Sequence, residues 1–209
     1  MDLQKEQIIQ TSDNLFKTNG IRNISIDQIC SDLRISKKTF YAHFMQKEDL
    51  VDAVVTYNKQ QTLNKFSKNL KNKNAIDGLI FIVREIKKNA DCESHAMWFD
   101  IEKYYPRLFE KHQNEQKVTI KNGFENNLHQ GITEGYYRKD LDIELTSIFH
   151  AIQIKNTFDL MEQSSIKFTK KRLLDFFIDL MMHLIANEKG LKYLEEHYFK
   201  DEKTEKVTT

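Results

Sequence analysis

The segment from residue 33 to residue 48 concentrates positive charge in a chain that is otherwise balanced. Its basic residues are Arg34, Lys37, Lys38 and Lys47. No acidic residue lies between its two ends, although the whole chain of 209 residues carries a formal net charge of only +1. Cations gathered on one short stretch are typical of a surface that faces phosphate groups. The sequence therefore predicts a nucleic-acid contact here, and the alternative is an ordinary solvated face.

Two serines mark the helices that would hold these cations. Ser25, with Gln28 three residues later, matches a capping box, and Ser36 is a second N-cap. Both helix ends then leave backbone N–H groups free to bind phosphate oxygens. Phe40 and Phe44 are four residues apart and are expected to face inward. The side chains expected to reach base edges or groove walls are Lys37, Lys38, Thr39 and His43. Tyr41 is expected to contact a phosphate, because Phe40 and Phe44 already occupy the inner face, and the alternative is a core position.

Apolar residues recur at helical spacing along nearly the whole chain. With six glycines and one proline, turn-forming residues are scarce, so the fold class is expected to be all-α. The short helices 25–33 and 36–44, separated by a tight turn, indicate a helix-turn-helix. Five other helices are expected at 4–19, 46–70, 75–88, 143–162 and 169–187. A further helix is expected to restart at Pro106 and to end near Gly135. Gly190 is expected to act as a stop, followed by a short helix that reaches residue 199.

The N-terminal quarter resembles the DNA-binding domain of the tetracycline-repressor (TetR) family of regulators. The resemblance rests on Gly20, the run from Ile21 to Ser25, Ile26, Ile29, Cys30, the run from Ser36 to Phe44, and the run from Gln46 to Leu50. It implies that the helix starting at Ser36 is the recognition helix. It also implies that Tyr41 and Lys47 touch phosphates and that Thr39 contacts a base or a phosphate.

Two positions depart from the family pattern. The family commonly has glycine where this chain has Arg34, in the turn, and where it has Lys38, in the recognition helix. A left-handed Arg34 would cost on the order of 1 kcal/mol relative to glycine, which a packed motif tolerates. Lys38 adds a cation where the DNA groove is negative.

The expected domain organisation follows from the motif and the resemblance. Residues 1–47 form a three-helix, helix-turn-helix DNA-binding domain, followed by a connecting helix at 46–70. Residues 48–199 form a helical effector-binding and dimerisation domain, and 200–209 form a disordered tail. Apolar residues surround helix 169–187, which predicts contact with both its own core and a second subunit. The resemblance likewise implies a homodimer formed through the helices at 143–162 and 169–187.

Aromatic and polar residues in the second domain predict an apolar pocket for a small apolar or amphipathic effector. The alternative for each of them is an ordinary core position. The predicted lining residues are Trp98, Phe99, Glu102, Tyr105, Phe124, His129, Phe149, His150 and Gln153. His150 and Gln153 stand on an apolar helix, where a buried polar group needs a partner.

Several classes of protein lack support in this sequence. No nucleophile elbow, glycine-rich phosphate loop or zinc-binding helix motif occurs, so an enzyme, a cofactor and a metal site are not expected. Cys30 and Cys92 are expected to be core residues, and no apolar run is long enough for a membrane span. The expected protein is a cytoplasmic regulator that binds a palindromic double-stranded operator as a homodimer, and the resemblance implies that it is a ligand-responsive repressor. The alternative is a regulator or adaptor that binds a protein partner without small-molecule gating.

Overall fold

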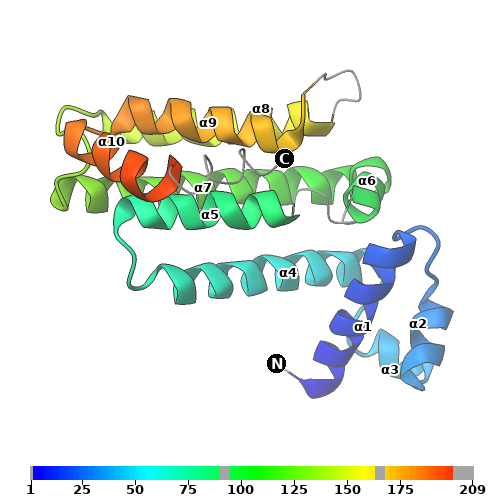
Figure 1. Cartoon of the computed structure of the whole chain (residues 1–209). Coiled ribbons are helices and arrows are strands. Elements are labelled where there is room, and N and C mark those ends of the chain that lie inside the picture. The colour runs from blue at the N-terminus through cyan, green and yellow to red at the C-terminus, as the bar shows by residue number, and fades with distance from the viewer. Residues whose placement is uncertain (1, 90–94, 163–167, 200–209) are drawn as a thin grey trace, which may run out of the picture. The chain divides into compact units, whose positions relative to one another are not determined.

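The protein is built from helices in the computed structural model, which describes residues 2–89, 95–162 and 168–199 (Figure 1). The helices are α1 Leu3–Asn19, α2 Ile26–Leu33, α3 Lys37–Tyr41, α4 Lys47–Leu70, α5 Ala75–Asn89, α6 His95–Tyr104, α7 Pro106–Thr133, α8 Ile143–Glu162, α9 Lys170–Ile185, α10 Glu188–Leu194 and the π-helix η1 Glu195–Phe199. Within the described ranges there is no strand beyond one isolated bridge between Tyr137 and Ala186. The all-α prediction is confirmed, and the predicted disordered tail 200–209 lies outside the described residues.

The chain divides into two compact units, and their residue ranges differ from the single boundary expected after residue 47. The N-terminal unit comprises residues 1–67 and 92–114, and the C-terminal unit comprises 68–91 and 115–209. Ile101 of α6 and Leu108 of α7 explain the difference, because they are buried in the same core as Phe16 and Phe40. The N-terminal core therefore includes a segment that lies far along the chain.

Short polar caps and one glycine set the ends of the first helices. Asp2 accepts the N–H of Gln4 at 3.1 Å, and Ser25 accepts the N–H of Gln28 at 3.1 Å, which confirms the cap predicted at Ser25. Helix α1 ends at Gly20, whose φ of 75° lies in the region that favours glycine. The next two helices can therefore fold back on α1.

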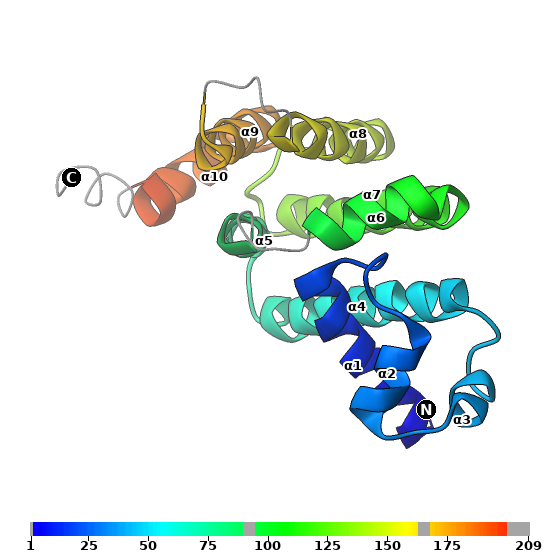
Figure 2. The same ribbon diagram turned by 90° about the vertical axis from the view of Figure 1, so that its right-hand side faces the viewer.

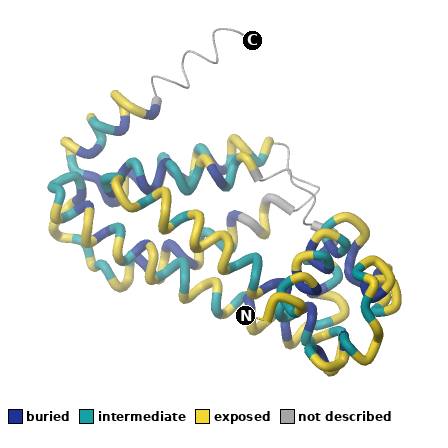
Figure 3. Tube along the Cα trace, turned by 90° about the horizontal axis from the view of Figure 1, so that it is seen from below, coloured by how far each residue is buried: buried dark blue, intermediate teal, exposed yellow. Residues whose placement is uncertain are grey.

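In the C-terminal unit, α8 and α9 lie side by side above α5 and the second half of α7 (Figures 1 and 2). Buried and exposed positions alternate along the helices, as Figure 3 shows. The core of this unit includes Ile76, Leu128, Tyr137, Met182 and Ile185. Residues from α5 and α7 and residues from α9 therefore pack together in this core.

The stop expected at Gly190 is wrong, because this residue lies inside α10. Asn187 caps that helix by accepting the N–H of Gly190 at 3.0 Å. A Cβ at position 190 would collide with the carbonyl oxygen of Tyr136. The glycine thus permits close packing and does not end a helix.

Two further expectations concern the cysteines and membranes. Cys30 is a free, buried thiol in the N-terminal core, as expected, whereas Cys92 lies outside the described residues. None of the helices in the described ranges is both long and apolar enough to cross a bilayer.

Candidate nucleic-acid interface

The turn between α2 and α3 depends on Arg34, whose backbone is left-handed with φ 54° and ψ 39°. Glycine, which is common here in the TetR family, adopts this conformation without strain. The N–H of Arg34 donates to the carbonyl of Ser31 at 3.1 Å, and the N–H of Ile35 donates to that of Cys30 at 2.9 Å. These bonds satisfy the end of α2, while the Arg34 side chain remains exposed.

Helix α3 is held by a cap at its start and two phenylalanines beneath it. Ser36 Oγ accepts the N–H of Thr39 at 3.0 Å. Phe40 and Phe44 are buried with ring centroids 5.7 Å apart, as predicted. The helix covers Lys37–Tyr41 and is shorter than the predicted 36–44, because residues 42 and 43 form a turn. Tyr41 remains 48% exposed, and its ring centroid lies 5.5 Å from that of Phe40.

The two lysines of α3 differ in their surroundings. Lys37 Nζ lies 2.7 Å from Asp27 Oδ1 of α2, and both side chains are exposed. This hydrogen bond raises the pKa of Lys37. Lys38 is exposed and makes no ion pair or hydrogen bond with the residues described. Sequence reasoning missed Asp27, because its distance from Lys37 depends on the fold of the turn.

Lys47 and His43, both predicted to contact DNA, have partners inside the protein. The Lys47 ammonium donates to the carbonyl oxygens of Ile21, at 2.6 Å, and Ile24. Burial lowers the pKa of Lys47. His43 Nε2 lies 3.2 Å from Gln4 Oε1 of α1. DNA contacts by these two residues stay predictions, and the structure shows that both side chains already support the N-terminal fold.

The remaining predicted residues form one polar surface around α2 and α3, which pack together (Figure 2). Its exposed members are Ser25, Arg34, Ser36, Lys37, Lys38 and Tyr41, with Thr39 partly exposed. The surface offers cations, hydroxyls and two capped helix starts, which are suited to phosphate oxygens and base edges.

The predicted pocket residues are divided between the two units. Trp98 and Tyr105 pack against the core of the N-terminal unit, and Phe99 and Glu102 of the same unit are exposed. In the C-terminal unit, His129 and Phe149 are exposed, and Gln153 is partly exposed. The structure therefore places these predicted pocket residues in two different units.

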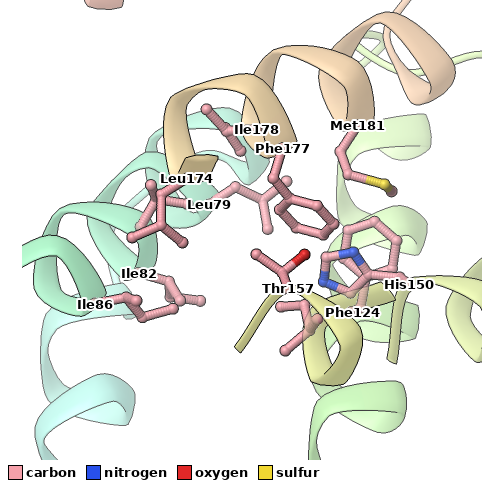
Figure 4. A pocket seen from close by; sticks show the side chains of 12 residues that line it. Leu79, Ile82, Ile86, Phe124, His150, Thr157, Leu174, Phe177, Ile178 and Met181 are labelled. Atoms are coloured by element: carbon pink, nitrogen blue, oxygen red, sulfur yellow. The ribbon is translucent and has the colours of Figure 1, made fainter. Parts of the chain in front are cut away.

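Phe124 and His150 do line a cavity, of about 40 Å³, within the C-terminal unit (Figure 4). Helices α5, α7, α8 and α9 enclose it with apolar side chains, His150 and Thr157. The His150 ring stacks on Phe124 with centroids 3.7 Å apart. The contributions of α5 and α9 were missed, because their apolar residues look like any helical core in the sequence.

Known proteins match the chain in two ways. The sequence model described as "Bacterial regulatory proteins, tetR family" matches residues 8–54. The HTH-type transcriptional regulator YerO of Bacillus subtilis is 40% identical over 65 residues, or 31% of this chain and 22% of YerO. The HTH-type transcriptional regulator UidR of Escherichia coli is 28% identical over 78 residues, which is 37% of each chain. The chain thus aligns with 22% of YerO and 37% of UidR.

Solved structures extend the likeness to the whole fold. A TetR-family transcriptional regulator from Cytophaga hutchinsonii superposes with a TM-score of 0.70 at 16% identity. The superposition covers 90% of this chain and 97% of that one, so it includes the C-terminal helices. The capped α3 and the sequence match over residues 8–54 lead to one assignment: this N-terminal segment is similar to the DNA-binding region of the tetR family of bacterial regulatory proteins, and the solved structures show that the rest of the chain shares their fold.

Proposed function

We propose that this protein represses transcription by binding a palindromic operator as a homodimer, with α3 in the major groove. The observation that carries the proposal is the arrangement of α3, which exposes Lys38 and Tyr41 while Phe40 and Phe44 anchor its other side. A helix of this kind fits the major groove, where lysine pairs with guanine O6 and N7. Two such helices related by a two-fold axis would read two half-sites.

An apolar face on α8 and α9 supports the homodimer. The large apolar residues exposed there are Leu145, Ile148, Phe149, Ile152, Leu160, Phe176, Leu180 and Leu184. On α9, Phe176, Leu180 and Leu184 are four residues apart and so form one stripe. A second copy that paired its α8 and α9 with those of the first would remove these apolar residues from water and make a four-helix interface.

We further propose that a small molecule releases the repressor from DNA. A ligand that prefers dimers whose α3 helices are wrongly spaced lowers the DNA-bound population. The cavity behind α8 and α9 supports this role, since it touches the two helices that carry the proposed dimer face.

One observation favours a second candidate, a regulator that no small molecule gates. The cavity volume of about 40 Å³ is far below that of sites for drug-sized ligands, which hold roughly 300–1,000 Å³. Native mass spectrometry of the purified protein distinguishes the two candidates. A co-purifying small molecule supports gating, and a partner protein in its place supports the adaptor.

Selection from random double-stranded DNA tests the DNA-binding proposal. The wild type should enrich an inverted repeat, whereas the variant with Lys37, Lys38 and Tyr41 all changed to alanine should enrich none. The matched control is Lys117→Ala with Lys139→Ala, which removes two exposed lysines from the C-terminal unit. Sedimentation should show dimers for all three proteins. Undiminished selection by the α3 variant would refute the proposal.

A further inference from the structure

The cavity of the C-terminal unit contains a polar atom that lacks a partner. His150 is 7% exposed, and its Nδ1 is buried with no hydrogen bond to the residues described. Buried polar atoms in native proteins nearly always have a partner, because each unpaired one costs about 1–3 kcal/mol. The ring nitrogens of His150 face the space enclosed by the labelled side chains of Figure 4. A molecule inside the cavity could therefore form a hydrogen bond with His150 Nδ1.

The walls around that nitrogen are apolar and aromatic. Phe124 stacks on one side of the His150 ring, and Phe177 lies at a centroid distance of 5.7 Å. Thr157 is the other polar residue of the lining, and its hydroxyl already donates to the carbonyl of Gln153 at 2.8 Å. A water molecule in a cavity needs two to four polar partners, which this lining does not supply well.

Among the residues that the structure describes, no charged side chain lines the cavity. Burial lowers the pKa of His150 to about 4, so the ring is neutral near pH 7. Lys87 of α5, next to the lining residue Ile86, is engaged with Asp175 and donates to the Tyr198 hydroxyl at 3.0 Å. An ionised ligand would therefore lose its hydration without gaining a counter-ion here.

We propose that this cavity binds a small uncharged molecule with a hydrocarbon body and one hydroxyl group, such as a phenol or a short alcohol. A hydroxyl both donates and accepts, so it satisfies His150 Nδ1 in either tautomer of the ring. The hydrocarbon body enters between Phe124, Phe177 and the aliphatic side chains, which must move apart because the empty space is only about 40 Å³. Met181 in the lining is a flexible, adaptable side chain that can make room for a ring.

Such a ligand would act on the helices that carry the proposed dimer face. His150 stands on α8 next to the exposed Phe149, and the lining residue Phe177 stands on α9 next to the exposed Phe176. A body inserted between α7 and these helices shifts their outer faces. The inference rests on the proposed ligand response, and it names the chemical class of the effector.

Calorimetric titration of the DNA-free protein at pH 7.5 tests the ligand class with phenol, toluene and benzoate. Phenol should bind about five- to tenfold more tightly than toluene, which has its shape but no hydroxyl, because one hydrogen bond contributes about 1 kcal/mol. Benzoate should not bind. Equal affinity for phenol and toluene, binding of benzoate, or no binding of phenol would overturn the proposal.

His150→Phe supplies the test at the residue. This variant should bind phenol and toluene equally, whereas His129→Phe, which changes an exposed histidine on α7, should keep the wild-type preference. Should His150→Phe fail to fold, His150→Gln, which retains a hydrogen-bonding group, should keep part of the preference for phenol. An unchanged preference in His150→Phe would contradict the role of this nitrogen.

Failure of this inference and failure of the proposed function remain distinguishable. DNA selection requires α3 and no ligand, while the titration requires the cavity and no DNA. The α3 alanine variant should lose DNA and retain phenol, and His150→Phe should retain DNA. Phenol should release the selected DNA from the wild type but not from His150→Phe. This result would show that ligand binding in the cavity controls DNA binding.

Discussion

At the scale of single residues, lysines that look alike in the sequence have different roles. Lys38 extends from the surface, Lys37 is paired with Asp27, and Lys47 is half-buried against the carbonyl groups of the turn after α1. The Lys47 ammonium also lies 6.0 Å from the ring centroid of Phe16. We therefore expect Lys47 to stabilise the N-terminal unit.

Lys47→Met tests this role by removing a donor from two carbonyl oxygens. The variant should lower the free energy of unfolding by about 1–3 kcal/mol, as expected for buried polar groups left unpaired. Lys38→Met, which changes an exposed lysine without such partners, should stay within about 0.5 kcal/mol of the wild type. The single tryptophan, Trp98, packs against this core, so its fluorescence during urea unfolding reports the stability of this unit.

The opposite result for Lys47→Met is equally informative. Wild-type stability together with weaker DNA binding and a smaller salt dependence would show that the ammonium leaves its carbonyl partners to bind a phosphate. Removing one phosphate-binding cation should reduce the slope of log affinity against log salt by about 0.9.

At the scale of helices, close approaches between elements depend on glycines. Tyr137 is buried and donates to Asn127 Oδ1 at 3.1 Å, with its ring lying against Gly131 of α7. Burial raises the pKa of Tyr137. The ring can occupy this place because position 131 has no Cβ, which ties the segment after α7 to that helix.

Substitutions of two glycines on the same helix should have opposite effects on stability. Gly131→Ala puts a Cβ into the Tyr137 ring and should destabilise the C-terminal unit by about 1–3 kcal/mol, as overpacking does. Gly123→Ala meets no atom within 4 Å and should stabilise the protein by about 0.5–1 kcal/mol, because alanine favours helix. Circular dichroism during thermal unfolding measures both. A stabilising Gly131→Ala would show that Tyr137 is free to move.

At the scale of the whole molecule, the proposed homodimer depends on the exposed apolar residues of α8 and α9. Phe176 is 64% exposed in the single chain, an unusual position for a large aromatic residue without a partner. Its neighbours on the stripe, Leu180 and Leu184, are exposed as well. A second copy of the chain would cover all three.

Phe176→Glu should convert the dimer into a monomer by placing a charge in the apolar interface. Val118→Glu is the matched control, since Val118 is 57% exposed on α7 and lies outside the α8 and α9 face. Light scattering after size-exclusion chromatography measures the mass of each. The monomer should also bind inverted-repeat DNA more weakly, because the two half-sites are no longer read together. Dimers of Phe176→Glu would place the interface elsewhere.

Several features could be predicted from local patterns in the sequence. Helix α8 begins and ends at the predicted residues 143 and 162, and α4 begins one residue after the predicted start. The caps at Ser25 and Ser36 and the inward Phe40 and Phe44 also follow from residues close together in the chain. Periodic burial and helix capping depend on residues a few positions apart, so a short stretch of sequence is enough to predict them.

What the sequence determined by itself was therefore the helical class, the helix-turn-helix and the outward face of α3. Tertiary structure alone decided that α6 and the start of α7 belong to the N-terminal core, that Lys47 and His43 have internal partners, and that the predicted pocket residues separate. It also decided which helices enclose His150. Each of these facts depends on contacts between distant segments, which local periodicity does not encode.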